Sequence, residues 1–315
     1  MKRRTLFKSG MAALLSSLLN KFSFGFDNRE ATKLQKREYA KGVHLSIIGF
    51  GGIVVVGMEQ KQANDIVAES IDRGVNYFDV APSYWDGEAE EKLGKALQPY
   101  RKDIFLACKT MERDAKGSEK ELNESLKRIG VDHFDLYQLH AVTGLVEVEK
   151  IFAPQGAIET FVKAKKEGKI RFLGFSAHSE EAAIALLDRF EFNSVLFPIN
   201  FVCFAQGKFG PRVLEKAKEK GVSRLALKSL AYTPLADRKE NPYPKCWYKP
   251  IDNESLAEKA LRFTLSQEIT AAIPPGDEGL FRMALKLALR YKPLGEEDIK
   301  MLFAQATGKV SLFPL

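Results

Sequence analysis

The sequence predicts a (β/α)8 TIM barrel that forms a single domain, with a C-terminal tail, over residues 41–315. Short apolar runs alternate with longer amphipathic segments eight times between residues 43 and 289. Apolar strands buried on both faces are typical of a parallel sheet covered by helices. An open doubly wound sheet is the alternative, but the chain lacks the Gly-x-Gly-x-x-Gly phosphate-binding loop of many such folds. Glycine also recurs where a helix should turn into the next strand, at Gly74, Gly130, Gly168 and Gly221.

Eight short apolar segments are expected to be the strands. The first, residues 44–52, contains the run from Leu45 to Phe50 and ends in Gly51 and Gly52. The other segments are similarly short and rich in Val, Ile, Leu, Phe or Tyr. They cover residues 76–80, 104–109, 134–140, 170–176, 194–201, 224–230 and 269–274.

The helices are expected from apolar residues at helical spacing and from start and stop signals. In residues 62–73, Ile66, Val67 and Ile71 share one face, and Gly74 follows as a stop. Ser118 and Glu121 match a capping box that would open the third helix. One further helix is expected to begin at Glu88, one to end at Gly168 and one to begin at Ser179. Three more are expected over residues 212–220, 256–265 and 280–289.

The N-terminal segment differs in composition from the rest of the chain. Residues 1–40 carry nine Lys or Arg and three Asp or Glu, whereas the remainder carries 39 basic and 38 acidic residues. The net charge of +7 therefore belongs to this segment and does not indicate a nucleic-acid-binding surface.

The start of the chain resembles a twin-arginine export signal. Arg3 and Arg4 precede Lys8 and the apolar run of residues 11–19, which at nine residues is shorter than the ~20 needed to span a bilayer. We expect residues 1–40 to be an export leader and linker, with membrane contact only through the export machinery. The protein would then be periplasmic or exported. The alternative is an amphipathic N-terminal helix on a cytoplasmic protein.

Three consecutive strands are expected to end in polar side chains of catalytic type. Asp79, Lys109 and His140 end the second, third and fourth strands, and Tyr84 follows Asp79 in the next loop. The carboxyl ends of parallel strands are where such folds place active sites. A nearby ammonium lowers the pKa of a tyrosine, and Lys109 is the candidate that would let Tyr84 act as an acid. Taken singly, each residue also has a structural explanation, such as a buried ion pair or a core histidine.

The run Asp79-Val-Ala-Pro-Ser-Tyr84, with Glu90 and Gly94 downstream, resembles the signature of the aldo-keto reductase family. Lys109 and His140 stand where that family keeps its catalytic lysine and histidine. The resemblance implies hydride transfer from a nicotinamide to a carbonyl carbon, or the reverse alcohol oxidation. Tyr84 would protonate the oxygen. The expected cofactor is NADP, with NAD possible, and the substrate a small aldehyde or ketone, sugar-derived ones included.

The resemblance extends less fully to the cofactor site. Ser176 matches the family serine that contacts the carboxamide, but Ala177 replaces the usual Asn. The family's Gln after the sixth strand is missing, and Asn200 is expected to take over part of its role. Leu227 stands where a tyrosine is usual. Arg282 is a candidate partner for a 2′-phosphate or, equally, a solvated helix residue. The expected cofactor-binding residues are Gly51, Gly52, Ser176, Asn200, Lys228, Ser229, Pro274, Gly276 and Arg282.

Two other classes of function are alternatives to an aldo-keto reductase. A nicotinamide-binding sensor or scaffold with little turnover would not need all four polar groups. A barrel hydrolase or lyase would need a metal cluster or a carboxylate pair at the strand ends, and the sequence indicates neither. Trp85 and Trp247 are candidates to line a substrate pocket. The three cysteines, Cys108, Cys203 and Cys246, are unclustered and support neither a disulfide framework nor a metal site.

Overall fold

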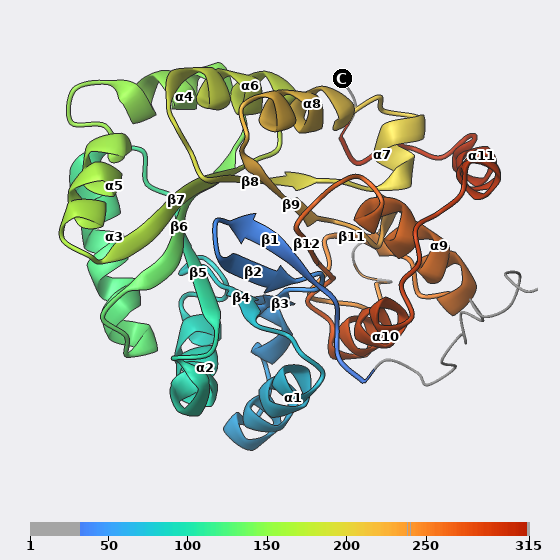
Figure 1. The fold of residues 1–315 in the computed structure, drawn as a ribbon, viewed down its shortest axis with the longest axis horizontal. Helices are drawn as coiled ribbons and strands as arrows, with labels where there is room; N and C mark the ends of the chain where they lie inside the picture. Colours follow the sequence, from blue (N-terminus) through green and yellow to red (C-terminus); the bar gives the residue numbers. More distant parts are fainter. Residues whose placement is uncertain (1–31, 238, 240, 314–315) are drawn as a thin grey trace, which may run out of the picture. The chain divides into compact units, whose positions relative to one another are not determined.

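The computed structural model describes residues 32–237, 239 and 241–313. Its central sheet has eight parallel strands in the order β12-β9-β8-β7-β6-β5-β4-β3, so each strand lies beside the next one of the sheet along the chain (Figure 1). The predicted (β/α)8 barrel is confirmed. The strands are β3 (Phe50–Gly51), β4 (Tyr77–Asp79), β5 (Phe105–Thr110), β6 (Phe134–Val142), β7 (Ile170–Ala177), β8 (Ser194–Pro198), β9 (Ser223–Leu227) and β12 (Ala271–Ile273).

The sheet closes on itself between the segment before β3 and the last strand. The amide of Gly49 donates to the carbonyl of Ala272 at 2.9 Å, and the amide of Ala272 donates to the carbonyl of Ile47 at 2.9 Å. Ile48 and Ala272 form a parallel bridge at the same place. The main-chain groups of both edge segments are thereby paired, as a barrel requires.

Eight helices follow the eight strands on the outside of the barrel. The third begins earlier than predicted, because the Asp114 side chain caps it by accepting from the Gly117 amide at 2.8 Å. The predicted capping box is therefore wrong, since Ser118 lies inside the helix and Glu121 accepts from the Met111 amide at 3.0 Å. The helices are α1 (Gln60–Asp72), α2 (Glu88–Leu97), α3 (Ala115–Ile129), α5 (Ala157–Lys166), α6 (Glu180–Arg189), α8 (Pro211–Glu219), α9 (Glu254–Leu265) and α10 (Glu278–Leu289).

Three connections at the carboxyl ends of strands contain structure that the sequence did not predict. Helix α4 (Leu145–Phe152) follows β6, and the short helix α7 (Phe201–Ala205) follows β8. The predicted sixth strand is therefore too long, because β8 already stops at Pro198. After β9, strands β10 (Ala231–Pro234) and β11 (Tyr248–Pro250) pair antiparallel. All three insertions lie at the end of the barrel where polar groups were expected.

The linker predicted to reach Ala40 is wrong for its last residues. Strand β1 (Lys36–Ala40) pairs antiparallel with β2 (Val43–Ser46), and the hairpin lies across the barrel (Figure 1). The Tyr39 hydroxyl donates to Ser194, the first residue of β8, at 2.9 Å, so the hairpin covers the amino-terminal end of the strands. Together they enclose the inner core, which comprises Tyr39, Leu45, Tyr77, Phe105, Ala107, Leu136, Leu196, Leu225 and Ala271.

The C-terminal tail contains α11 (Glu296–Ala306) and then returns to the barrel. The Phe313 ring stacks on Phe209 with centroids 5.3 Å apart and lies 5.1 Å from the ring of His178 and 6.0 Å from that of Trp247. The tail therefore covers part of the end at which β7 finishes. Within the described ranges, no helix has the length and apolar character needed to cross a membrane. The predicted twin-arginine run lies outside the described residues.

Candidate active site

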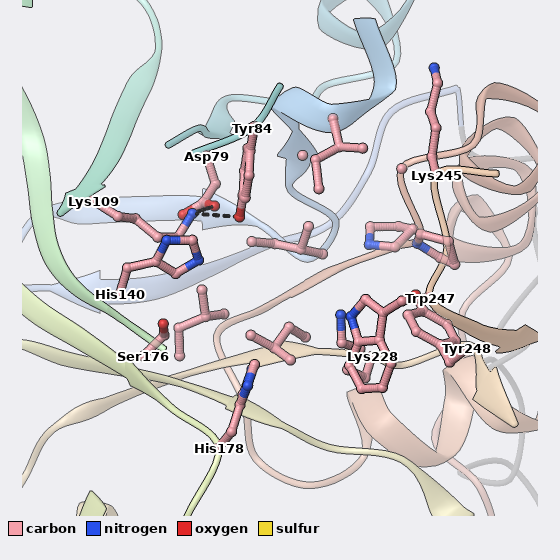
Figure 2. Close-up of a pocket in the computed structure, with 18 residues that line it drawn as sticks. Asp79, Tyr84, Lys109, His140, Ser176, His178, Lys228, Lys245, Trp247 and Tyr248 are labelled. Carbon is pink, nitrogen blue, oxygen red and sulfur yellow. Dashed lines mark hydrogen bonds and ion pairs between the residues drawn. The ribbon is translucent and has the colours of Figure 1, made fainter. Parts of the chain in front are cut away.

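A pocket of about 230 Å³ opens at the carboxyl ends of the strands (Figure 2). Each strand of the barrel contributes one lining residue, and the connection after β9 forms one wall of the pocket. The eight strand residues are Gly51, Asp79, Lys109, His140, Ser176, Leu196, Leu227 and Ile273. The pocket therefore brings together the polar groups that the sequence placed on three separate strands.

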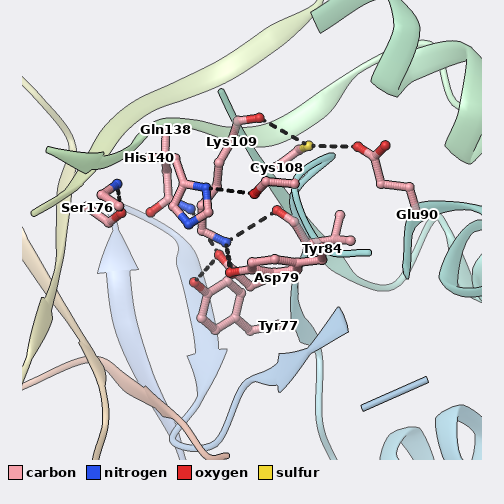
Figure 3. Close-up of polar contacts among 12 residues, drawn as sticks. Tyr77, Asp79, Tyr84, Glu90, Cys108, Lys109, Gln138, His140 and Ser176 are labelled. Carbon is pink, nitrogen blue, oxygen red and sulfur yellow. Dashed lines mark hydrogen bonds and ion pairs between the residues drawn. The ribbon is translucent and has the colours of Figure 1, made fainter. Parts of the chain in front are cut away.

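Lys109 is the centre of the polar cluster (Figure 3). Its ammonium forms an ion pair with the Asp79 carboxylate, and both side chains are almost fully buried. It also donates to the Tyr84 hydroxyl oxygen at 3.1 Å and to the Val80 carbonyl at 3.3 Å. Because the Tyr84 oxygen accepts from Lys109, the phenolic hydrogen stays free to point elsewhere. The predicted contact of Asp79, Lys109 and Tyr84 is thus present.

The electrostatics of this cluster keep Lys109 charged. Desolvation lowers the pKa of Lys109, but Asp79 and Tyr84 together raise it by more, so the net pKa lies above the ordinary value. For Tyr84, desolvation raises the pKa, and the nearby Lys109 ammonium lowers it only in part. The expectation of a net lowering of the Tyr84 pKa is therefore not met. Tyr84 is protonated at neutral pH, as a proton donor must be.

His140 faces Tyr84 with the two ring centroids 5.6 Å apart and nearly perpendicular. Its Nδ1 lies 3.3 Å from the Ser83 hydroxyl, and its carbonyl accepts from Arg113 at 2.6 Å. Desolvation, followed by the charge of Lys109, holds the pKa of His140 well below its usual value. The imidazole is therefore neutral at physiological pH and presents one N–H donor.

Two contributors to the cluster were not predicted from the sequence. The Tyr77 hydroxyl donates to Asp79 Oδ2 at 3.1 Å, and the Gln138 amide donates to the same oxygen at 2.9 Å. Both side chains are fully buried. The sequence did carry a signal, because each lies two positions before a pocket residue on its strand and alternate residues of a strand share a face.

Glu90, part of the motif that suggested the family, is fully buried behind the pocket on α2. It forms an ion pair with Arg128 of α3 and accepts from the Cys108 thiol at 3.4 Å. It therefore ties two helices to the strand that carries Lys109, and it does not line the pocket.

Five of the nine expected cofactor-binding residues line the pocket, namely Gly51, Ser176, Lys228, Pro274 and Gly276. The Ser176 hydroxyl oxygen accepts from the Ala141 amide at 2.7 Å, which leaves its hydrogen available to a ligand. The Lys228 ammonium lies 5.0 Å from the Trp247 ring centroid and 4.7 Å from that of Tyr248. Within the described part of the chain, no carboxylate lies at ion-pair distance from it.

The other four expected residues, Gly52, Asn200, Ser229 and Arg282, lie outside the lining. Gly52 packs against Val80, where a Cβ would come within 2.7 Å of a methyl group. Asn200 caps α7 by accepting from the Cys203 amide at 2.9 Å, so its carbonyl oxygen is already used. The Ser229 hydroxyl is buried and has no hydrogen-bond partner among the residues that the structure describes. Arg282 pairs with Glu69 and, at 3.0 Å, with Glu278 on the outer surface.

Three further lining residues lie in loops. Trp247 lines the pocket as expected, whereas Trp85 is exposed and does not. Lys245 also lines it, and its ammonium donates to the Val54 carbonyl at 2.9 Å, which joins the connection after β9 to the loop after β3. His178 faces the same cavity, and desolvation lowers its pKa to about 4.

The sequence model of the Aldo/keto reductase family matches residues 47–280. This span covers most of the chain and includes all four polar groups expected to be catalytic. The chain belongs to the aldo/keto reductase family.

Relatives agree with this assignment. The uncharacterized oxidoreductase YqkF of Bacillus subtilis is 28% identical over 288 residues, which cover 82% of this chain and 92% of that protein. Aldo-keto reductase yakc of Schizosaccharomyces pombe, whose name specifies NADP(+), is 33% identical over 147 residues, or 41% and 42% of the two chains. The holo form of aldo-keto reductase AKR11C1 from Bacillus halodurans shares the fold, with a TM-score of 0.69 at 24% identity over 89% of this chain and 98% of that one.

This aldo/keto reductase is accordingly an NAD(P)-dependent oxidoreductase that reduces small carbonyl compounds. As in the family, its cofactor is NADP(H), with NAD(H) the alternative that the sequence leaves open. Two observations indicate that the pocket fits such a dinucleotide. The partly buried Lys228 ammonium, which lacks an anionic partner in the described ranges, lies after the seventh barrel strand, close to where TIM barrels bind phosphate groups. The free hydrogen of Ser176 suits a carboxamide oxygen.

Proposed function

We propose that Tyr84 is the general acid of this reductase and that the substrates are small aldehydes and ketones reduced with NADPH. The contact of Lys109 with both Asp79 and the Tyr84 oxygen carries the proposal. When bound, the reduced nicotinamide supplies the hydride. Tyr84 gives its proton to the carbonyl oxygen as negative charge develops there, and the Lys109 ammonium stabilises the phenolate that remains.

His140 orients the carbonyl in this proposal. The Ser83 hydroxyl lies 3.3 Å from Nδ1, and with serine as the donor the imidazole proton sits on Nε2. A neutral Nε2–H donates a hydrogen bond to the carbonyl oxygen without competing with Tyr84 as the proton source. The depressed pKa of His140 supports this role, because a neutral imidazole is a poor acid.

Cofactor binding is assigned to residues on two sides of the pocket. Ser176 donates its free hydroxyl hydrogen to the carboxamide, and the Lys228 ammonium pairs with a phosphate oxygen. Gly51, Pro274 and Gly276 line the cavity with little side-chain bulk. Leu227 offers an aliphatic surface to the nicotinamide ring in place of the family's tyrosine.

The size of the pocket favours small substrates. A cavity of about 230 Å³ must hold the reactive end of the cofactor as well as the carbonyl compound. Trp247, Tyr248 and His178 form the wall next to the C-terminal tail and favour compact or planar molecules.

Titration of the purified protein with NADPH and NADH, followed by nicotinamide fluorescence, tests cofactor binding first. Reduction of methylglyoxal, butanal and glyceraldehyde is then followed as loss of nicotinamide absorbance. Turnover of any of these that depends on Tyr84 supports the proposal. Tight binding of NADPH without turnover of any carbonyl compound would instead indicate a nicotinamide-binding sensor.

We also propose that the protein is exported through the twin-arginine route, on the strength of Arg3, Arg4 and the apolar run that follows. Cells making the unmutated protein, an Arg3→Lys with Arg4→Lys variant, and a Lys33→Arg control are fractionated. Export of the first and third proteins and retention of the second is the expected result. Retention of all three in the cytoplasm would end the export proposal and leave the enzymatic one intact.

A further inference from the structure

The Asp79 carboxylate uses its two oxygens differently. Oδ1 faces the Lys109 ammonium, whereas Oδ2 accepts from the Tyr77 hydroxyl at 3.1 Å and from the Gln138 amide at 2.9 Å (Figure 3). Neither Tyr77 nor Gln138 lines the pocket, and both are fully buried. The carboxylate therefore accepts from three donors while its side chain is almost fully buried.

The barrel makes specific room for these two donors. Tyr77 lies two residues before Asp79 on β4, and Gly49 leaves space for its ring, since a Cβ at Gly49 would lie 2.5 Å from Tyr77 Cδ1. Gln138 on β6 lies opposite Lys109 on β5 in the strand register. Its amide consequently reaches past the lysine to the far oxygen of the same carboxylate.

Both groups can act only as donors toward Asp79. Reversing the Gln138 amide would place two oxygen atoms 2.9 Å apart, one of them on a carboxylate, which is repulsive. Desolvation, followed by the charge of Asp79, raises the pKa of Tyr77 well above its usual value, so its hydroxyl keeps its proton. Each contact thus stabilises the ionised carboxylate and fixes its orientation.

We propose that Tyr77 and Gln138 are positioning residues that hold the Asp79 carboxylate directed at Lys109, and so control proton donation by Tyr84. The inference rests on the proposed role of Tyr84. Without the two donors, the negative charge of Asp79 concentrates toward Lys109. The carboxylate then offsets more of the positive charge of the ammonium. This weakens the stabilisation of the Tyr84 phenolate and so raises the pKa of Tyr84.

The test compares Tyr77→Phe, Gln138→Leu and the double variant with the unmutated protein. In reduction, kcat/KM at neutral pH should fall by roughly 5- to 50-fold in the double variant, and the loss of activity at high pH should begin at a higher pH. The dissociation constant for NADPH should change by less than about twofold, because neither side chain faces the pocket. Each single variant should show the same changes in kcat/KM and pH profile to a smaller extent. If the double variant does not fold, the single variants therefore test the proposal.

Tyr39→Phe is the matched control. It removes a buried hydroxyl from the same inner core, but this hydroxyl is bonded to Ser194 at 2.9 Å and not to Asp79. The variant can therefore lower thermal stability without moving the pH profile. Equal pH profiles for the double variant and the unmutated protein would overturn the proposal. So would an equal shift in Tyr39→Phe.

A second readout does not depend on turnover. The near-ultraviolet absorbance of tyrosinate, taken as the difference between each protein and its Tyr84→Phe counterpart, follows the ionisation of Tyr84 directly. This titration should move to higher pH in the double variant. An unmoved titration contradicts the positioning role even if the protein reduces no carbonyl compound, so failure of the proposed function is distinguished from failure of this inference.

Discussion

The Lys109 ammonium lies 3.1 Å from the Tyr84 hydroxyl oxygen while it is ion-paired with Asp79 on its other side. The Lys109 ammonium needs little reorganisation when negative charge develops on the tyrosine, because it is already fixed in place and largely removed from water.

Tyr84→Phe should lower carbonyl reduction by about 10²- to 10⁴-fold, the usual effect of losing an acid–base group, while NADPH binding persists. The ring remains and keeps its packing, so the fold should be unchanged. Tyr100→Phe, which alters a tyrosine outside the pocket, serves as the control and should retain full activity. Steady-state kinetics and fluorescence titration check both variants. Near-normal turnover of Tyr84→Phe would exclude Tyr84 as the acid.

Lys109→Met should reduce activity by a similar factor and also lower stability. The substitution leaves a buried carboxylate without its cation, for which a loss of roughly 3–5 kcal/mol in the free energy of unfolding is typical. Combined with Tyr84→Phe, it should lower the rate little further, because the two residues act as a unit. Chemical denaturation and kinetics of the three proteins provide the measurement. Multiplicative losses in the double variant would show that the residues act independently.

Arg128→Met should destabilise the protein by roughly 3–5 kcal/mol, since it leaves the fully buried Glu90 carboxylate without its cation. The matched control is Lys61→Met, which breaks the exposed pair with Asp65 and should cost less than about 1 kcal/mol. Urea unfolding of both variants distinguishes them. Equal small losses would mean that Glu90 finds another partner or takes up a proton.

Lys228→Met should weaken binding of both NADPH and NADH by about 10- to 100-fold, as expected for a lost charge-assisted contact of roughly 1.5–3 kcal/mol. Arg282→Ala should leave both affinities nearly unchanged, because Glu69 and Glu278 already pair with this guanidinium away from the pocket. Fluorescence titrations measure all four constants. Selective loss of NADPH binding in Arg282→Ala would restore the sequence-based assignment to a 2′-phosphate.

Cofactor affinity should also depend on pH through Lys228. Desolvation lowers the pKa of this lysine to about 8. Above that pH the free protein must take up a proton before the ammonium can pair with a phosphate, so the dissociation constant for NADPH should rise as pH increases through 8. In Lys228→Met this dependence should be lost. The same dependence in the variant would assign it to another group.

The order of the strands and the four polar side chains of the candidate active site could be predicted from the sequence, because both depend on local pattern. Strands such as residues 104–109 and 134–140 are short, apolar and followed by amphipathic helices. In a closed parallel barrel, their final residues must meet at one end. Asp79, Tyr84, Lys109 and His140 therefore converge once the fold class is known.

Contacts between distant segments were decided only by the tertiary structure. Asn200 and Arg282 have suitable side chains for a cofactor, yet Asn200 caps α7 and Arg282 pairs with two carboxylates. Lys245 reaches the pocket from a connection whose path no periodicity indicates. Tyr77 and Gln138 meet at one oxygen of Asp79 because Gly49 leaves room and the register sets Gln138 opposite Lys109. Such contacts depend on which side chains face each other across the barrel. The local pattern of the sequence predicts the strands and their order, but it does not predict which side chains face each other.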